Sequence, residues 1–337
     1  MIERVGLIGA GGVSHVHAQA WRELGRTVTV YSLDGAPELA RQYGFELADD
    51  LDEVLRTSDL IDVVTPTPSH REITVAALEA GLPVICEKPL GATQADAVAV
   101  AEAARAAGLP VFPAHVVRYM PDYAALKAAL DAGRIGPVAI ARWWRHGEAP
   151  GAGSWFHDES AGGGIVRDLM IHDLDQALWQ LGEVVEVYGV QSGASETGEP
   201  NAVAVAVLTH ASGAISQLTA SWGPRGTTFR TGYAVFGAEG MLRSDSDRNG
   251  PYLADVPGDA ASSGYMPPQT RAVSPYTAEI AGFLDVVEGR EAAARVGVDD
   301  GVAAVALAEL VMQSIAEGRA IPVGRVDAAE RESGELR

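Results

Sequence analysis

The sequence contains one cysteine, Cys86, and only two lysines, Lys88 and Lys127, among its 337 residues. A single cysteine excludes an intrachain disulfide bond and any zinc or iron–sulfur site that needs several cysteines. No apolar run approaches the ~18 residues needed to span a bilayer. The N-terminus lacks the basic segment and apolar stretch of a signal peptide. We therefore expect a cytoplasmic protein with no membrane partner.

Basic residues are scarce relative to acidic ones. The chain has 25 Lys and Arg against 45 Asp and Glu, which gives a formal net charge of −20. A surface with this charge repels phosphate groups, so we expect no nucleic acid partner. Hydrophobic residues make up 47% and charged residues 21% of the chain, as in a globular protein with a sizeable core. The length suggests two domains of about 150 residues each.

The first ~120 residues alternate short apolar runs with helical stretches, which is typical of a parallel sheet flanked by helices. The predicted strands lie near residues 3–8, 28–32, 60–65, 83–86 and 110–114. Nearly all their residues are apolar, as in strands that are buried on both faces. Ser69 and Thr93 are predicted to cap two of the intervening helices.

A glycine-rich turn follows the first predicted strand. Gly9 permits a tight turn, and Gly11 allows a diphosphate to approach the backbone N–H groups at the positive end of the next helix. Ser14, at the position of the third glycine of the fingerprint, is small enough for close helix–strand packing. We expect Gly9, Gly11, Gly12 and Val13 to bind a dinucleotide, although such a turn can also be purely structural.

The end of the second predicted strand indicates which dinucleotide is bound. A carboxylate at Ser32 would favour NAD, and an arginine beside it would favour the 2′-phosphate of NADP. Neither is present, but Asp34 can reach the ribose hydroxyls and no arginine follows directly. We therefore expect Ser32 and Asp34 to contact NAD or NADP, with NAD favoured. The alternative is that Asp34 simply begins the turn before Pro37.

The second part of the chain has a different pattern. Helices are predicted near 121–131, 164–181, 276–289 and 299–318, and strands near 137–146, 184–192, 202–209, 214–222 and 230–236. Strands that follow one another without helices indicate an α+β domain with a large, mostly antiparallel open sheet. Residues 202–208 are apolar on both faces, so we expect one face to pack on helices and the other on a second subunit. Residues 245–270 read as a long loop.

These patterns predict an α/β Rossmann dinucleotide-binding domain over residues 1–120. An α+β substrate-binding and oligomerisation domain is expected over residues 121–323, and a charged tail over residues 324–337. The two functions would then meet at the carboxyl edge of the parallel sheet, where open α/β folds bind their ligands.

Lys88 follows a buried strand at that edge. Its alternative role is a surface ion pair with Glu87. Asp168 and His172 are four residues apart in a predicted helix and therefore share a face within about 6 Å. This spacing suits a carboxylate that orients a proton-accepting imidazole. A first-turn helix carboxylate and a capped histidine are the structural alternative. A zinc site that adds Asp175 lacks a second ligand pair, so we expect no metal.

Three further stretches, together with the glycine turn, resemble the sequence motifs of one protein family. Residues 61–70 read Ile-Asp-Val-Val-Thr-Pro-Thr-Pro-Ser-His, and residues 83–90 read Pro-Val-Ile-Cys-Glu-Lys-Pro-Leu. Residues 162–175 read Gly-Gly-Gly-Ile-Val-Arg-Asp-Leu-Met-Ile-His-Asp-Leu-Asp. Their order and spacing resemble the Gfo/Idh/MocA family, named for glucose–fructose oxidoreductase, inositol dehydrogenase and a rhizopine-catabolism protein. The resemblance continues through residues 276–280 and the last predicted helix, about the whole chain.

The resemblance implies roles for individual residues. It implies that Lys88 polarises the reacting hydroxyl and that His172 is the catalytic base. Asp168 would be the polar partner of His172 and a substrate ligand. It also implies that Glu87 touches the nicotinamide ribose and that the bond between Lys88 and Pro89 is cis. The further residues expected to bind the cofactor are Thr65, Pro66, His70, Glu87 and Lys88.

Further candidates lie outside these motifs. The expected substrate contacts are His115, Arg118, Trp155 and His157. Arg118 could instead fix the hinge between the domains. Trp143, Arg145 and Phe156 complete an aromatic and polar cluster that suits a sugar, although aromatic residues on strands are more often core. His17 matches a family position and is expected to be structural, and Cys86 to be buried and non-catalytic.

Together these residues predict an NAD(P)-dependent oxidoreductase. It would transfer a hydride between nicotinamide and a secondary alcohol or ketone of a sugar, cyclitol or related polyol, as a homodimer or homotetramer. One alternative is a non-catalytic dinucleotide-binding regulator of the same family. Another is a sugar-modifying enzyme that uses the same site for a different redox-assisted reaction. The presence of Lys88, Asp168 and His172 together favours an enzyme.

Overall fold

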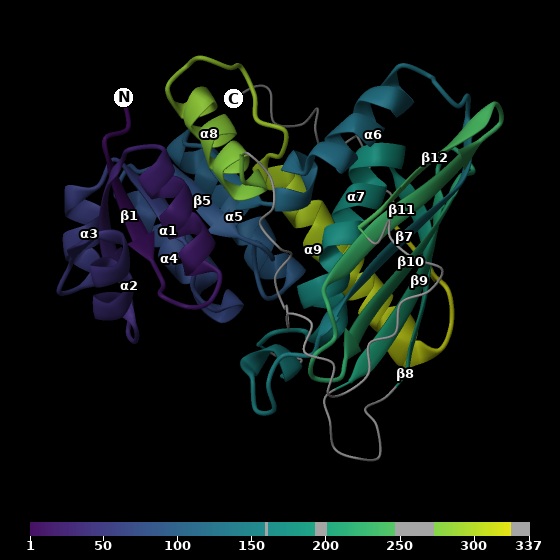
Figure 1. Ribbon diagram of the computed structural model, residues 1–337, viewed down its shortest axis with the longest axis horizontal. Helices are drawn as coiled ribbons and strands as arrows, with labels where there is room; N and C mark the ends of the chain where they lie inside the picture. Colours follow the sequence, from purple (N-terminus) through teal and green to yellow (C-terminus); the bar gives the residue numbers. More distant parts are fainter. Residues whose placement is uncertain (159–160, 193–200, 247–272, 325–337) are drawn as a thin grey trace, which may run out of the picture.

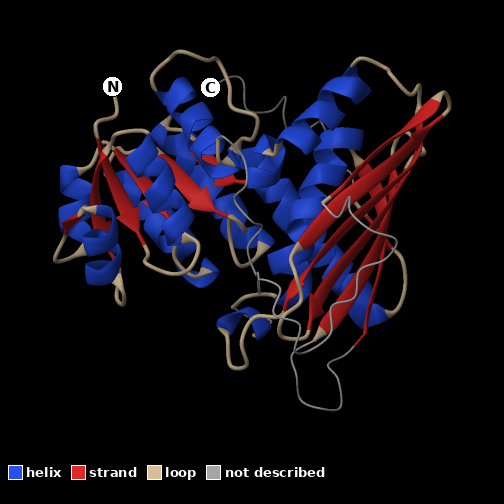
Figure 2. Cartoon of the chain, in the orientation of Figure 1, coloured by secondary structure: helices blue, strands red, loops and turns tan. Residues whose placement is uncertain are grey.

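The computed structural model describes residues 1–158, 161–192, 201–246 and 273–324. Two sheets lie at opposite ends of the molecule, with several helices between them (Figures 1 and 2). One is the six-stranded sheet of the N-terminal half, and the other is a seven-stranded sheet of long strands. The predicted pairing of a Rossmann-type domain with a large sheet domain is confirmed.

The N-terminal sheet is entirely parallel, with the order β3-β2-β1-β4-β5-β6. Its strands are β1 (Arg4–Ile8), β2 (Thr27–Tyr31), β3 (Glu46–Leu47), β4 (Leu60–Val63), β5 (Val84–Glu87) and β6 (Val111–Ala114). The helices of this half are α1 (Ser14–Glu23), α2 (Ala36–Tyr43), α3 (Leu51–Thr57), α4 (His70–Glu79) and α5 (Gln94–Ala107). The strand order reverses between β1 and β4, and ligands of such folds bind at this switch point.

One of the two predicted helix caps is correct. The Thr93 hydroxyl accepts a hydrogen bond from the Asp96 N–H at 3.1 Å and begins α5. Ser69 does not cap α4, because the turn Thr67–Ser69 precedes that helix and Ser69 already has helical backbone angles. Its hydroxyl instead donates to the Pro66 carbonyl at 2.8 Å.

The second sheet has the order β12-β11-β7-β10-β9-β8-β13. Its strands are β7 (Val138–Glu148), β8 (Val184–Ser192), β9 (Ala202–His210), β10 (Ile215–Gly223), β11 (Arg230–Gly237), β12 (Gly240–Asp245) and β13 (Ile321–Pro322). All neighbours are antiparallel except β7 and β10. The helices of this half are α6 (Pro121–Asp131), α7 (Ile171–Leu181), α8 (Pro275–Val287) and α9 (Val298–Glu317).

The helix predicted over residues 164–181 has two parts. Residues Val166–Met170 form a wider π-helical turn, and α7 follows directly. Most of the predicted loop 245–270 and nearly all of the predicted tail 324–337 lie outside the described residues. Strands β3, β12 and β13 were not predicted, because β3 and β13 have only two residues each and β12 is largely exposed.

The two faces of the large sheet differ in what covers them. Helices α7 and α9 pack on the inner face (Figure 1). Alternate residues of β9 follow this division, since Ala204, Ala206 and Leu208 are fully buried while Val203 is 39% exposed. The exposed large apolar residues of β8, β9, β10 and β12 are Tyr188, Val190, Val203, Ile215 and Met241.

The C-terminal helices join the two halves. Helix α8 packs against α1, and its Ile280 and Phe283 belong to the same buried cluster as Trp21 and Phe112 of the N-terminal half. Helix α9 contacts α5 on one side and β8 on the other. Within the part of the chain that the structure describes, no helix is long and apolar enough to cross a membrane.

Candidate active site

The carboxyl ends of β1, β4 and β5 bring three predicted binding segments to one edge of the parallel sheet. The glycine turn follows β1, Thr65 lies just beyond β4, and Lys88 follows β5 directly. Because these strands are parallel neighbours, segments far apart in the sequence converge there. From the other half of the molecule, the turn Val166–Met170 reaches the same place through a contact between Asp168 and Lys88.

The glycine turn has the shape that a diphosphate requires. Gly9 has a φ of 116°, and a Cβ there would lie 2.3 Å from the Val64 carbonyl oxygen, so no other residue fits. A Cβ on Gly11 or Gly12 would meet no atom within 4 Å, which leaves open space beside the start of α1. Ser14 is fully buried, as close packing of this helix on the sheet requires. The turn therefore fits a dinucleotide.

The turn after β2 lies beside the glycine turn. A Cβ on Gly35 would lie 3.2 Å from the Ala10 carbonyl oxygen, which shows how closely the two turns approach. Ser32 is half-buried and Asp34 is exposed. The Asp34 carboxylate is therefore available to a ribose placed along the start of α1.

His70 connects the loops that follow β4 and β5. Its Nδ1 lies 2.8 Å from the Pro89 carbonyl oxygen, and its Nε2 lies 2.8 Å from the Thr65 carbonyl oxygen. Burial lowers the pKa of this imidazole more than its hydrogen bonds raise it. Thus His70 holds the backbone of Thr65 in place. The bond between Lys88 and Pro89 is cis, as the resemblance implied.

Lys88 is paired across the two halves of the molecule. Its Nζ donates to Oδ1 of Asp168 at 3.0 Å and to the Asp168 carbonyl oxygen at 2.9 Å. The Lys88 side chain is 13% exposed and the Asp168 side chain 2%. The alternative of a surface ion pair between Lys88 and Glu87 is wrong, because the Lys88 ammonium binds Asp168 while the Glu87 carboxylate binds His17 and the backbone N–H of Lys88.

His172 does not have the partner that the spacing suggested. Asp168 lies in the π-helical turn, whose wider winding disturbs the i,i+4 stacking, and Lys88 binds its carboxylate. Nδ1 of His172 is buried and has no hydrogen-bond partner among the described residues. Burial, and then the positive charges of Lys88 and Arg145, hold the pKa of His172 well below its usual range. At neutral pH the imidazole is therefore neutral and can accept a proton.

Two buried ion pairs hold α7 in place beside the site. Nη2 of Arg145, from β7, donates to Oδ1 of Asp173 at 2.9 Å. Nη2 of Arg118 donates to Oδ1 of Asp175 at 2.6 Å, and its Nη1 donates to the carbonyl oxygen of Arg295 at 2.7 Å. Arg118 therefore connects the end of the first half to α7, which favours its hinge role.

The residues considered above as zinc ligands do not form a metal site. The Asp175 carboxylate is bound to Arg118, and that of Asp168 to Lys88. Across the described ranges, no group of three or more His, Cys, Asp or Glu residues is placed to hold a metal ion.

The other predicted substrate residues lie in different surroundings. His115 is 1% exposed, neither ring nitrogen has a hydrogen-bond partner in the described chain, and Nδ1 lies 3.9 Å from Oδ1 of Asp175. Trp155 stacks on Phe156 with ring centroids 4.1 Å apart. Nε2 of His157 lies 2.9 Å from the Pro150 carbonyl oxygen. Trp143 is core, as expected for an aromatic residue on a strand.

A buried polar network behind the site was not predicted. The imidazole of His17 lies between the carboxylates of Asp62 and Glu87, and Nε1 of Trp21 donates to Oδ2 of Asp62 at 2.6 Å. The signal in the sequence is Asp62 itself, a lone carboxylate in the apolar strand β4, since a buried charge needs a buried partner. Cys86 is buried, as expected, and burial raises the pKa of its thiol.

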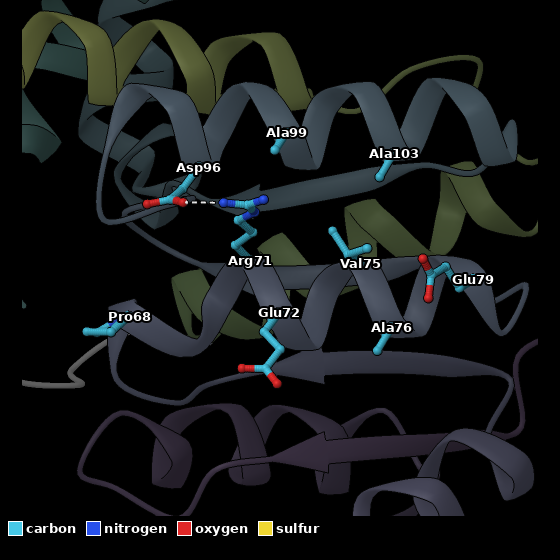
Figure 3. A pocket seen from close by; sticks show the side chains of 9 residues that line it. All are labelled: Pro68, Arg71, Glu72, Val75, Ala76, Glu79, Asp96, Ala99 and Ala103. Atoms are coloured by element: carbon cyan, nitrogen blue, oxygen red, sulfur yellow. Dashed lines mark hydrogen bonds and ion pairs between the residues drawn. The ribbon is translucent and has the colours of Figure 1, made fainter.

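A hollow lies on the surface between α4 and α5 (Figure 3). Its volume is about 670 Å³. It is lined by Pro68, Arg71, Glu72, Val75, Ala76, Glu79, Asp96, Ala99 and Ala103. Nη1 of Arg71 is paired with Oδ1 of Asp96 at 3.1 Å, and Glu72 and Glu79 leave the lining acidic. An acidic lining does not suit a diphosphate, so this hollow is not the cofactor site.

A parallel sheet with an open glycine turn, facing a lysine–carboxylate pair, defines a dinucleotide-dependent oxidoreductase. The chain belongs to the GFO/IDH/MocA family. Residues 3–115 match the model described as "Oxidoreductase family, NAD-binding Rossmann fold", and residues 123–243 match the model of the family's C-terminal domain. The predicted family, enzyme class and nicotinamide cofactor are thus confirmed.

Similar proteins span nearly the whole chain. D-apiose dehydrogenase of Paraburkholderia graminis is 30% identical, and the match covers 96% of this chain and 90% of that protein. Inositol 2-dehydrogenase of Rhizobium meliloti is 28% identical, with 96% of this chain and 100% of that protein covered. The crystal structure of a putative myo-inositol dehydrogenase from Sinorhizobium meliloti superposes with a TM-score of 0.81 at 27% identity, covering 96% and 100% of the two chains.

Proposed function

We propose that this protein is an NAD-dependent dehydrogenase that oxidises a secondary alcohol of a cyclitol, sugar or related polyol to the ketone, and catalyses the reverse reduction. One observation carries the proposal. The Lys88 ammonium, at the switch point of the parallel sheet, is joined to Asp168 of the other half, one helical turn before His172, whose Nδ1 has no hydrogen-bond partner among the described residues. The similarity to D-apiose and inositol dehydrogenases supports the substrate class.

The three side chains have complementary roles in this reaction. The Lys88 ammonium donates a hydrogen bond to the reacting oxygen and stabilises the negative charge that develops there. Asp168 fixes the direction of that ammonium. The neutral imidazole of His172 accepts the hydroxyl proton, and in the reverse direction it returns the proton to the carbonyl oxygen. A bound nicotinamide dinucleotide supplies the acceptor for the hydride that leaves the carbinol carbon.

The cofactor is placed by the residues along the sheet edge. Gly9, Gly11, Gly12 and Val13 would hold the diphosphate at the start of α1. Asp34, with Ser32, would bind the adenosine ribose, and because no arginine follows Asp34 we favour NAD over NADP. The residues proposed to face the nicotinamide half are Thr65, Pro66 and Glu87, with His70 holding the backbone of Thr65.

Other features of the proposal concern the substrate and the assembly. His115 is buried beside Asp175, and neither of its ring nitrogens has a hydrogen-bond partner in the described part of the chain; it would bind a substrate hydroxyl. Trp155 and His157 would contact the substrate from their loop. The apolar outer face of the large sheet supports a homodimer or homotetramer. Location in the cytoplasm stays a prediction of the sequence.

A spectrophotometric screen tests the proposal. The purified protein is mixed with NAD or NADP and a panel of inositols, aldoses, anhydrosugars and sugar acids, and the absorbance of the reduced nicotinamide is followed. We expect turnover with at least one polyol and faster turnover with NAD. NAD binding by calorimetry without turnover, in either direction, would contradict the proposal and favour the regulator. Conversion of the sugar with no net change in nicotinamide would favour the redox-assisted alternative.

A further inference from the structure

His17 lies in a buried row of charged groups that ends at Lys88. Its Nδ1 is 2.9 Å from Oδ2 of Asp62, and its Nε2 is 3.1 Å from Oε1 of Glu87. The side chains of His17 and Asp62 are 0% exposed and that of Glu87 is 9% exposed. The three residues come from α1, β4 and β5, so the row crosses the sheet edge where the cofactor binds.

Both nitrogens of His17 must donate hydrogen bonds, because an ionised carboxylate can only accept them. The imidazole is therefore held as a cation. Burial opposes this charge, but the attraction of Asp62 and then of Glu87 holds the pKa of His17 well above its usual range. The same pairing lowers the pKa of Glu87 against the effect of burial.

Two groups face His17 from α8, Tyr276 and Glu279. The ring of Tyr276 lies 6.1 Å from that of His17, centroid to centroid. Both carboxyl oxygens of Glu279 are buried without a hydrogen-bond partner among the described residues. Burial and the nearby Glu87 raise the pKa of Glu279 well above its usual range, so this environment opposes the ionisation of Glu279.

Glu87 transmits the position of His17 to Lys88. One carboxylate oxygen of Glu87, Oε1, faces His17, and the other, Oε2, accepts the backbone N–H of Lys88 at 2.9 Å. The side chain of Lys88 then reaches Asp168. We propose that His17 is a positioning residue for the reaction, because it fixes Glu87 and through it the backbone from which Lys88 meets the substrate. This inference rests on the proposed function.

A purely structural role explains the row less well. Buried charges lose their hydration, and well-packed apolar side chains of similar volume are often as stabilising or more so. An apolar α1–β5 contact would thus suffice to hold the helix on the sheet. The hydrogen bonds instead end on the main chain of Lys88.

The kinetic test compares two buried histidines. His17→Gln removes the charge, and His210→Gln is the matched control. His210 is 1% exposed and its ring nitrogens also have two partners, Gly182 O at 3.0 Å and Ser216 Oγ at 2.9 Å, but it lies at the end of β9. We expect His17→Gln to lower kcat about 10- to 100-fold while the KM for NAD changes less than about threefold, and His210→Gln to leave kcat within about twofold.

The outcomes separate this inference from the proposed function. If the wild type is active and His17→Gln has a kcat within about twofold of it, the positioning role alone is overturned. An inactive wild type would contradict the proposed function. Imidazole ¹⁵N NMR of the wild type reports the protonation of the two ring nitrogens of His17. It does not depend on turnover, and the His17→Gln variant is needed only to assign the signals. Two protonated ring nitrogens on His17 at about pH 8 are expected, and a neutral ring there would also overturn the inference.

Discussion

His172 illustrates how the charges of single residues prepare the site for chemistry. Burial, and then the charges of Lys88, Arg145 and His115, lower its pKa and disfavour an imidazolium ion. Arg145 and Arg118 are each already paired with an aspartate of α7. Nδ1 of His172 has no hydrogen-bond partner among the described residues, so this imidazole can exchange a proton with a substrate.

The pH dependence of alcohol oxidation follows from this environment. His172 must be neutral to accept a proton, and its lowered pKa keeps it neutral below its usual titration range. We expect its contribution to kcat/KM to stay constant from about pH 8 down through 6.5 and to fall only at lower pH. His172→Asn should lower kcat about 10²- to 10⁴-fold at neutral pH. If kcat/KM of the wild type falls on the acid side with a midpoint at or above about pH 6.5, and His172→Asn lacks this fall, the assignment of His172 as a base with a lowered pKa is contradicted.

Sequence reasoning identified the site residues better than their partners. Lys88 was recognisable because it follows a buried strand at the carboxyl edge of a parallel sheet. Its partner Asp168 is 80 residues away, and the spacing of Asp168 and His172 in the sequence suggested a direct contact between those two instead. The π-helical turn that separates them leaves no simple periodicity to read.

At the scale of whole elements, α8 completes the core of the half that binds the cofactor. Its Ile280 and Phe283 pack with Trp21, and its Glu279 is enclosed near His17 and Glu87. The sequence predicted this helix within about two residues, but its place against α1 depends on packing between segments more than 250 residues apart. Local periodicity does not encode such contacts.

Glu279 should make the stability of this contact depend on pH. Its pKa is raised in the folded protein, so between the unfolded pKa near 4.3 and the folded pKa the native state binds one more proton. The free energy of unfolding therefore falls as the pH rises through that window, by about 1.4 kcal/mol per pH unit from this group. We expect Glu279→Gln to gain stability relative to the wild type as the pH rises from about 5 to 8.

Chemical denaturation of both proteins at several pH values measures this difference. Glu291→Gln is the control, because Glu291 is exposed and lies in the loop after α8. A constant offset between Glu279→Gln and the wild type over the whole pH range would show that Glu279 is ionised in the folded protein.

At the scale of the whole molecule, helices α7 and α9 cover the inner face of the seven-stranded sheet (Figure 1). Its outer face presents exposed apolar side chains. The sequence indicated this second face, since residues 202–208 are apolar at every position. It did not indicate the order of the strands, because the parallel pairing of β7 with β10 depends on long connections. The overall two-domain architecture was predictable because each half has its own periodicity.

The exposed face predicts the mass of the protein in solution. Light scattering at micromolar concentration should give two or four times the chain mass of 35.2 kDa. Val203→Glu, on this face, should lower that mass, since a buried charge at an interface is unfavourable. Leu47→Glu is the control, because Leu47 is 51% exposed but lies on the other sheet. A wild-type mass of one chain would contradict the proposed assembly.

The most direct test of the account uses the two lysines of the chain. Lys88→Met and Lys127→Met remove the same charge, but Lys127 lies on α6 and pairs with Asp131 one turn away. With NAD and the best polyol, we expect Lys88→Met to lower the kcat for nicotinamide reduction by about 10²- to 10³-fold and Lys127→Met to leave it within about twofold. Equal turnover by the folded Lys88→Met variant and the wild type would contradict the central role assigned to Lys88.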